Sequence, residues 1–388
     1  MSKELVIIYD TPSMTHAHII SIHNLAYYLK YFDKIHITYW SKEKVPEIFE
    51  REEGKFIFYP YLKPYNSGYI AGIKFMIWIG RTLWKICQSI PKEAKLVFMP
   101  VIPLWAGLPA LVVGKLKGKK VVLRLEAHKI DYFEIESELE GHSGPGLVLK
   151  VFILKLIYRL SLPFYDLVIG ISQGLIREAK KYGARKTVKI PILINAEPFL
   201  SLERKGDYFG PPRILYVGQI KKIKGLETLV LAAKALKSEG CLFRLEIAGS
   251  VTNPKDEIFS RQLKTMADGL DIEFLGHVPH LNLAEVFQRA DVFVNPSFTE
   301  ALGMAMMEAM ASGLPVIATQ TSGAKDLVED GKTGFLVPIK DPLALKEKIK
   351  ILMENPDLRK KMGEAGRERI EKILEETNKE NEKLWQAI

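Results

Sequence analysis

Two glutamates, Glu300 and Glu308, stand eight positions apart in an almost wholly apolar stretch, "TEALGMAMMEAMASG". Residues 303–312 are predicted to form a helix that stops at Gly313, with Pro315 just beyond. Because apolar residues occupy every side of this helix, we expect it to be buried. An ionised carboxylate is costly there unless it is paired or hydrogen-bonded, so Glu308 needs a partner. No basic residue lies one turn away, which leaves an Arg or Lys from elsewhere in the fold, or the hydroxyls of a ligand.

The spacing of the two glutamates indicates which chemistry they serve. Eight helical residues rise by ~12 Å, whereas the paired carboxyls of glycosidases lie ~5 to 9.5 Å apart. The longer span suits a ligand with hydroxyls at both ends and phosphates between them, because a helix N-terminus offers N–H groups and a positive dipole to anions. Gly303 would let the backbone approach such a phosphate. The pattern predicts a nucleotide diphosphate sugar, with sugar hydroxyls at Glu300, the diphosphate at the amides of residues 301–304 and ribose hydroxyls at Glu308.

The elements that must position these residues are strands and helices in alternation. Strands are predicted within residues 4–10, 34–40, 95–100, 119–128 and 166–172, and again within 212–218, 242–249, 272–278, 291–297 and 314–319. Apolar strands separated by helices indicate parallel sheets covered on both faces. Since the rhythm occurs twice in 388 residues, we expect an α/β fold of two Rossmann-like doubly wound domains whose strand C-terminal ends face a central cleft. The linker is placed near residues 195–211, where prolines and a charge cluster interrupt the pattern.

The charge of the chain is concentrated in its first half. The net charge is +9, but residues 1–200 hold 28 Lys and Arg against 18 Asp and Glu, while residues 201–388 hold 27 against 28. This asymmetry favours an acidic partner for the first half, such as anionic lipid, a phosphorylated acceptor or nucleic acid. A solvated basic face without a partner is the alternative. No nucleic-acid-binding module is recognisable, so no nucleic acid is predicted as a partner.

Two apolar segments, residues 69–90 and 146–171, are interrupted by basic residues. Neither supplies the ~20 largely uncharged residues that a membrane-spanning helix needs. Two interpretations stay open. The basic residues, interleaved with the aromatic residues Trp78, Trp84, Phe152 and Tyr158, could lie along a membrane surface, or these could be core helices with solvated lysines.

The cysteines and the first residues indicate the cellular compartment, and the cysteines favour a reducing one. Cys87 and Cys241 have no metal-ligand spacing around them. The start, "MSKELVIIYD", has too short an apolar run for a signal peptide. We expect a cytoplasmic protein, placed at the inner face of the membrane if the basic half docks there.

A resemblance to a known family begins at the two glutamates. Residues 293–338, "FVNPSFTEALGMAMMEAMASGLPVIATQTSGAKDLVEDGKTGFLVP", resemble the donor-site signature of the retaining GT-B glycosyltransferases, in particular glycosyltransferase family four, the group 1 glycosyl transferases. The resemblance implies that Glu300 binds donor-sugar hydroxyls and Glu308 the ribose. It thus agrees with the assignment made from their spacing.

The resemblance continues upstream in "YVGQIKKIKGLETLVLAAKAL", residues 216–236. Gly218 and the Lys224-Gly225 pair match the family, which implies that Lys224 contacts the donor diphosphate and stabilises the leaving nucleotide. The family's usual arginine is here Gln219, which implies a weaker hold on the phosphates.

The match in the first half is looser. "GKKVVLRLEAHKIDYF" is similar to the family's strand that ends in a histidine facing the transferred sugar, which implies this role for His128. The first loop lacks the family's Gly-Gly, and Ser13, His16 and His18 are only candidate acceptor contacts.

The resemblance implies a domain plan and a set of site residues. The domains are an acceptor-binding domain at 1–196, a donor-binding domain at 197–370, and a C-terminal helix at 371–388 that returns to the first domain with Trp385 as its anchor. The implied catalytic residues are Glu300, Lys224 and His128, and the implied donor-binding residues are Gly218, Gln219, Gly249, Val278, Ala301, Leu302, Gly303 and Glu308.

The implied reaction is hexosyl transfer from a nucleotide-diphosphate sugar, with retention, to a hydroxyl of an acceptor glycan or of a lipid-linked or polyanionic acceptor. No Asp-X-Asp motif is present, so neither a metal nor another cofactor is predicted. Two alternatives are a non-catalytic sugar-nucleotide-binding protein and an epimerase or phosphorylase of the same two-domain shape.

Overall fold

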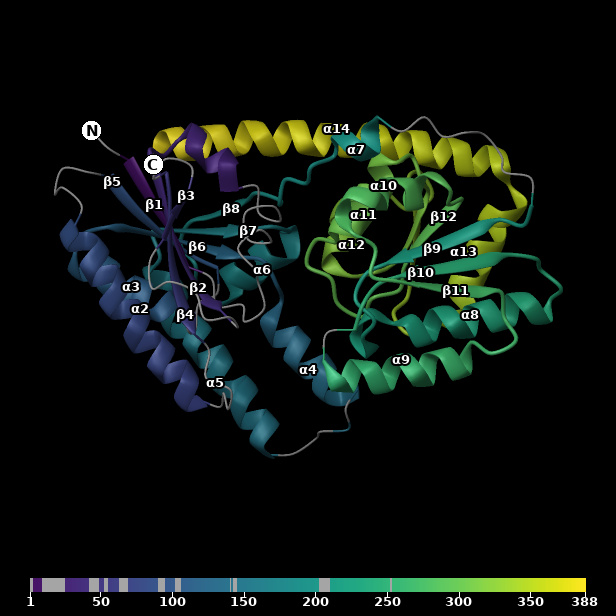
Figure 1. The fold of residues 1–388 in the computed structure, drawn as a ribbon, viewed down its shortest axis with the longest axis horizontal. Coiled ribbons are helices and arrows are strands. Elements are labelled where there is room, and N and C mark those ends of the chain that lie inside the picture. Colours follow the sequence, from purple (N-terminus) through teal and green to yellow (C-terminus); the bar gives the residue numbers. More distant parts are fainter. Residues whose placement is uncertain are drawn as a thin grey trace. The chain divides into compact units, whose positions relative to one another are not determined.

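A computed structural model describes residues 3–8, 25–41, 49–51, 55–62, 69–89, 95–101, 106–139, 141, 145–201, 210–251 and 253–388 (Figure 1). The chain divides into two compact units. Unit 1 comprises Met1–Ile130, Gly144–Leu193 and Lys379–Ile388, and unit 2 comprises Asp131–Ser143 and Ile194–Asn378. Both units are built on a largely parallel sheet, in agreement with the predicted α/β class.

The described residues of unit 1 form an eight-stranded sheet. Its order is β3 (Phe49–Arg51), β4 (Phe56–Leu62), β2 (Lys34–Ser41), β1 (Lys3–Ile8), β5 (Lys95–Pro100), β6 (Lys120–Leu125), β7 (Leu167–Gly170) and β8 (Thr187–Lys189). Every pair is parallel except β3 with β4. The five predicted strands are present, and their near-continuous burial explains why they read as apolar runs.

The helices of unit 1 connect these strands. They are η1 (Leu25–Lys30), α2 (Tyr69–Ser89), α3 (Leu108–Leu116), α5 (Pro145–Ser161), η3 (Leu162–Phe164) and α6 (Gln173–Lys181). Helix α6 begins at Ser172, whose hydroxyl accepts a hydrogen bond from the amide of Leu175. In the ranges described above, no helix has the length and hydrophobicity needed to cross a bilayer.

Unit 2 contains a six-stranded parallel sheet in its described part. The order is β11 (Ile272–Gly276), β10 (Arg244–Ala248), β9 (Arg213–Val217), β12 (Val292–Asn295), β13 (Val316–Thr319) and β14 (Gly334–Val337). From β9 the chain moves outward to β10 and β11, and it then returns to β12 on the other side of β9. Strands β9 and β12 therefore flank the switch point of the sheet, where ligands of doubly wound folds bind beyond the strand C-termini.

The helices of unit 2 are α4 (Lys129–Leu139, from Asp131), α7 (Glu197–Leu200), η4 (Lys222–Lys224), α8 (Leu226–Ser238), α9 (Pro254–Met266), α10 (His280–Gln288), α11 (Met304–Ala311), α12 (Ser322–Leu327), α13 (Pro342–Glu354) and most of α14 (Pro356–Ala387). Helix α8 packs against α9 and α13, and α11 packs against β12 and β13. The helix predicted at 303–312 is α11, and Met306–Ala311 are buried throughout, as its apolar surface indicated.

Residues 131–143 group with unit 2, although the sequence placed them within an N-terminal domain of 1–196. The contacts of α4 give the reason. Glu138 accepts a hydrogen bond from Lys340 Nζ at 2.8 Å, and Glu136 and Leu139 line a cavity with residues of α9.

Helix α14 is a single helix of 32 residues that begins earlier than the predicted residue 371. Within unit 2, Arg359 donates to the carbonyl oxygens of Leu352 and Met353 at 2.7 and 2.9 Å. In unit 1, Trp385 is fully buried, with its ring edge-on to Tyr28 and Phe32. The helix thus belongs to the cores of both units.

Candidate functional site

The loops that follow β9 and β12 bring Lys224 and Glu300 together at the switch point of unit 2. Lys224 Nζ lies 2.7 Å from Glu300 Oε2, and both side chains are mostly shielded from solvent, at 26% and 18% exposure. Lys224 ends η4, and Glu300 lies in the loop before α11. A cation and a carboxylate are therefore fixed where the fold places ligands.

Backbone contacts hold these two loops in register. Gly225 adopts φ 69°, and a Cβ at this position would lie 2.0 Å from the carbonyl oxygen of Pro296. The amide of Phe298 donates to the carbonyl oxygen of Ile223 at 2.9 Å. Only glycine fits where the β9 loop crosses the β12 loop so closely. The Lys224–Glu300 pair is therefore positioned by the backbone as well as by its own charges.

A buried tyrosine that the sequence analysis did not single out supports the first of these loops. The Tyr216 hydroxyl donates to the carbonyl oxygen of Gln219 at 2.9 Å, and a Cβ on Gly218 would lie 2.7 Å from the same hydroxyl. Burial, and secondarily the charge of Glu300, raise the pKa of Tyr216, so its hydroxyl stays protonated as a donor. The signal in the sequence was a tyrosine within the otherwise aliphatic run of residues 214–217. The side chain of Gln219 itself is exposed.

The backbone of Glu300 is held by the first residues of α12. The amide of Gly323 and the hydroxyl of Ser322 donate to the Glu300 carbonyl oxygen at 2.9 and 3.2 Å. Gly303 caps α11 with φ 91°, where a Cβ would meet Met306 Cε. Ala301 is half-buried and Leu302 is buried. The N-terminus of α11 thus follows directly on the Glu300 loop. The amides of Met306 and Met307 donate to the Gly303 carbonyl oxygen at 3.0 and 3.2 Å, whereas the amides before them precede the first bond within the helix.

Glu308 has a partner that neither predicted option included. Its Oε1 lies 3.0 Å from His280 Nε2, at the start of α10. The Glu308 side chain is 9% exposed, whereas the His280 side chain is 58% exposed. The hydrogen bond to Glu308 raises the pKa of His280, against a smaller opposing effect of burial. The buried carboxylate is thus paired with a histidine that can carry a proton, and not with an Arg or Lys.

Gly249 and Val278, like Lys224 and Glu300, lie beyond the carboxyl ends of strands of the unit 2 sheet. Gly249 follows β10, and a Cβ there would lie 1.9 Å from the carbonyl oxygen of Gly218. Val278 follows β11 and is half-buried, two residues before His280. The structure therefore gathers the sequence-predicted residues of unit 2 along one edge of its sheet.

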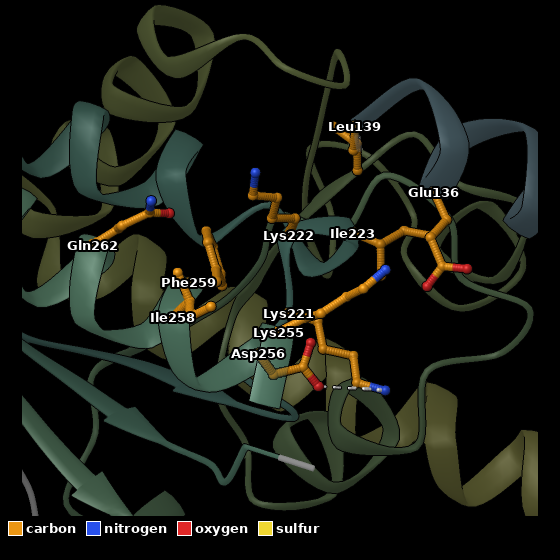
Figure 2. A pocket seen from close by; sticks show the side chains of 10 residues that line it. All are labelled: Glu136, Leu139, Lys221, Lys222, Ile223, Lys255, Asp256, Ile258, Phe259 and Gln262. Atoms are coloured by element: carbon orange, nitrogen blue, oxygen red, sulfur yellow. Dashed lines mark ion pairs between the residues drawn. The ribbon is translucent and has the colours of Figure 1, made fainter. Parts of the chain in front are cut away.

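A cavity of about 340 Å³ flanks the η4 turn (Figure 2). Its lining residues are Glu136, Leu139, Lys221, Lys222, Ile223, Lys255, Asp256, Ile258, Phe259 and Gln262. Lys221 Nζ lies 3.9 Å from Asp256 Oδ2. Neither Lys224 nor Glu300 lines this cavity, so it adjoins the switch-point pair without containing it.

His128, the predicted site residue of the first half, lies in unit 1 just beyond β6. It is 8% exposed, and its Nδ1 lies 2.6 Å from Glu178 Oε2. A carboxylate on one ring nitrogen fixes the ring orientation and the tautomer. The candidate acceptor contacts Ser13, His16 and His18 fall outside the described residues.

The metal prediction rests on the sequence alone. Across the residues that the structure describes, no three His, Cys, Asp or Glu side chains are grouped as they would be around a metal ion. Independence from metal ions remains a prediction.

Comparisons with known proteins show what the second half of the chain is similar to. Residues 202–369 match the sequence profile described as glycosyl transferases group 1. The capsular polysaccharide biosynthesis glycosyltransferase CapM of Staphylococcus aureus is 31% identical over 245 residues, which cover 57% of this chain and 61% of that protein. The D-inositol 3-phosphate glycosyltransferase of Arthrobacter sp. (strain FB24) is 34% identical over 161 residues, covering 40% and 38%. The chain thus matches less than two thirds of either relative.

Solved structures extend the likeness in fold to the whole chain. Sucrose-phosphate synthase from Thermosynechococcus elongatus has a TM-score of 0.76 at 19% identity, covering 100% of this chain and 99% of that one. Anabaena Alr3699/HepE in complex with UDP and glucose has a TM-score of 0.70 at 13% identity, covering 99% of both. The predicted fold class of two Rossmann-like domains is confirmed.

Proposed function

We propose that the protein transfers a sugar from a nucleotide-diphosphate sugar to an acceptor hydroxyl, because residues 202–369 match the profile of the group 1 glycosyl transferases and the chain has the GT-B fold. The observation that carries the proposal is the Lys224–Glu300 pair at the switch point of unit 2. Its cation stands beside the N-terminus of α11, where an anionic diphosphate is favoured. The complex of Anabaena Alr3699/HepE with UDP and glucose supports a donor of this class.

Lys224 and the α11 N-terminus stabilise the charge that develops on the departing diphosphate. Lys224 reaches one side of the phosphates, while the amides at Ala301, Leu302 and Gly303 donate from the other. Donors fixed before the reaction stabilise developing charge without reorganisation, and the backbone contacts of Gly225 fix Lys224 in advance. Gln219 replaces a permanent cation in this set and contributes at most a hydrogen bond.

Glu300 and Glu308 bind the two ends of the donor. The 2.7 Å contact with Lys224 orients the carboxylate of Glu300, so that it accepts hydrogen bonds from the sugar hydroxyls. Glu308, oriented by His280, accepts from the ribose hydroxyls. Val278 lies beside the base, while Gly218 and Gly249 leave room for the diphosphate.

The transfer proceeds with retention and without a metal ion. The bond from the anomeric carbon to the diphosphate oxygen breaks, the acceptor oxygen bonds to the same carbon from the same face, and the acceptor proton passes to the departing phosphate. Lys224 supplies the cationic stabilisation that a metal provides elsewhere. His128, which Glu178 holds within unit 1, stays a predicted contact of the transferred sugar.

Substitution of the pair tests the proposal. Lys224→Ala and Glu300→Ala should each lower transfer by about a hundredfold or more, which is the usual loss when one preorganised electrostatic contact is removed. The matched control is Lys222→Ala, two residues away in the same turn, which should stay within a fewfold of the original rate. Transfer is measured by release of the free nucleotide in the presence of an acceptor.

The donor must be identified first, by thermal shift with UDP-, GDP- and ADP-sugars. Unchanged turnover in both Lys224→Ala and Glu300→Ala would contradict the proposed site. Donor binding without any turnover would instead favour a non-catalytic sugar-nucleotide-binding protein.

The acceptor is proposed to be lipid-linked or polyanionic, and the protein to work at the inner face of a membrane. The support is the excess of ten basic over acidic side chains in residues 1–200. Such a surface attracts anionic partners over a distance of about 10 Å at moderate salt.

A further inference from the structure

Helix α5 exposes a continuous apolar stripe. Its exposed apolar residues, each 43–70% accessible, are Val148, Leu149, Phe152, Ile153, Leu156 and Leu160. At about 3.6 residues per turn these positions share one face, opposite the buried Val151, Leu154 and Tyr158. An ordinary surface helix is apolar toward the core and polar toward solvent. Helix α5 is apolar on both sides.

The charges of α5 flank this stripe and have a single sign. At the same helical spacing, Lys150 falls on one edge, and Lys155 and Arg159 fall on the other. The 17 residues of the helix contain no aspartate or glutamate. Basic edges around an apolar stripe complement a surface that is anionic outside and apolar below, as a lipid bilayer is.

Helix α2 repeats the pattern in the same unit (Figure 1). Ile73, Ile77 and Trp84 are exposed, they alternate with basic residues, and none of its 21 residues is acidic. Tryptophan favours the level of the lipid headgroups. Of the aromatic residues that the sequence suggested for such a surface, Trp84 and Phe152 are exposed, and the Lys117 ammonium lies 3.4 Å from the centroid of the Trp84 ring. Trp78 instead packs on Tyr61 at a ring distance of 5.1 Å, and Tyr158 is buried.

We propose that the exposed faces of α5 and α2 dock unit 1 on an anionic lipid bilayer. The apolar side chains enter the boundary between headgroups and acyl chains, while the lysines and arginines at the edges contact lipid phosphates. The purpose of docking rests on the proposed function, because a lipid-linked acceptor would then be presented to the enzyme. The docking itself requires only unit 1.

Vesicle flotation of the full chain tests the proposal. The chain should float with vesicles of phosphatidylcholine and phosphatidylglycerol, float less with phosphatidylcholine alone, and be released as salt is raised. Phe152→Glu combined with Leu156→Glu should weaken binding by more than about tenfold, because both charges would enter the apolar boundary. Glutamate is a good helix former, so α5 should persist.

A matched pair separates this surface from a general effect of charge. Leu231→Glu with Leu343→Glu changes the net charge equally at two exposed leucines of unit 2, and should leave flotation unchanged. Equal loss in both double variants would overturn the proposal. Should Phe152→Glu with Leu156→Glu fail to fold by circular dichroism, Phe152→Gln with Leu156→Gln tests the same stripe without charge.

The basic edges are tested by neutralisation. Lys150→Gln, Lys155→Gln and Arg159→Gln together should lower affinity for anionic vesicles by about fivefold for each charge. The matched control, made in unit 2, is Lys360→Gln, Lys361→Gln and Lys372→Gln, all exposed on α14. An equal loss in this control would show that net charge alone drives the binding, and would overturn the role of α5.

The donor site provides an independent readout. Lys224→Ala should float as the unchanged chain does, and the α5 variants should keep their thermal shift with the donor. Loss of transfer with intact flotation would sink only the proposed function. The other possible outcome is a chain that does not bind anionic vesicles but forms a dimer, which Phe152→Glu with Leu156→Glu dissociates. This outcome would overturn the lipid proposal and would identify this face as an interface between copies of the chain.

Discussion

At the scale of single residues, the His280–Glu308 pair makes the site sensitive to pH. The folded protein raises the pKa of His280 above its unfolded value. The pair therefore stabilises the folded protein at pH below the pKa of His280 in the unfolded state. This stabilisation is lost as the pH rises through the higher pKa of His280 in the folded state. Since the His280 side chain is 58% exposed, the effect should stay under about 1 kcal/mol.

An NMR titration measures the His280 pKa directly. The pKa of His280 should lie above the ordinary value of an unperturbed histidine and should fall in Glu308→Gln, which removes the charged acceptor. The control is His277→Gln, which replaces an exposed histidine three residues earlier and should leave the His280 titration unchanged. A His280 titration that Glu308→Gln leaves unchanged would contradict the pairing.

The residue contacts of the site were only partly accessible from the sequence. The helical spacing of Glu300 and Glu308 assigned them to the two ends of one ligand, and the helix that carries Glu308 is present and buried. Contact between Lys224 and Glu300 joins residues 76 positions apart, which no periodicity reveals. The His280 partner was missed because only an Arg or Lys from elsewhere in the fold, or a ligand, was considered for Glu308, whereas the partner is a histidine on another helix.

At the scale of elements, helix α8 offers a controlled comparison of two glycines. Gly225 precedes the helix and Gly240 follows it, with φ of 69° and 78°. A Cβ on Gly225 would lie 2.0 Å from the Pro296 carbonyl oxygen, whereas a Cβ on Gly240 would meet nothing within 4 Å. Both Gly→Ala substitutions carry the left-handed strain of about 1–2 kcal/mol. Only Gly225→Ala adds a steric clash, worth about a further 1–3 kcal/mol.

The two variants should also differ in donor binding. Because Gly225 adjoins Lys224, its substitution should weaken the donor-induced thermal shift, while Gly240→Ala should keep that shift and lose only stability. Chemical denaturation gives the free energy of unfolding of each variant. Equal losses of stability and equal donor shifts would show that the close passage of the two loops does not position the site.

Sequence patterns predicted the strands that form long apolar runs and missed β3, β4, β8 and β14. Continuous apolar runs identified β1, β2, β5, β6 and β7 in unit 1 and β9 to β13 in unit 2. Strands β3 and β8 have three residues each, which is too short for a pattern. Strand β4 contains Pro60, which argues against a strand when only the sequence is known. Strand β14 lies within the donor-site run of residues 293–338, which was interpreted as a motif, so its short apolar stretch was not assigned to a strand.

At the scale of the whole molecule, α14 contributes to two separate hydrophobic cores. Most of the helix belongs to unit 2, while Lys379–Ile388 belong to unit 1. Trp385 is the largest fully buried side chain of the described residues. Its ring centroid lies 5.6 Å from that of Tyr28 and 5.4 Å from that of Phe32. The last turns of the chain are therefore part of the fold of the first unit.

Trp385→Ala should consequently destabilise unit 1 and spare unit 2. Removing a buried tryptophan leaves a cavity and costs about 3–5 kcal/mol, which should appear as faster hydrogen exchange in peptides from β1 and β2. Peptides from β9 and β12 should keep their protection, and the donor-induced thermal shift should persist. The control is Gln386→Ala, an exposed neighbour on the same helix, which should change neither unit. Equal loss of protection in both units would mean that α14 makes them unfold as one, whereas unchanged exchange in unit 1 would show that Trp385 does not secure its core.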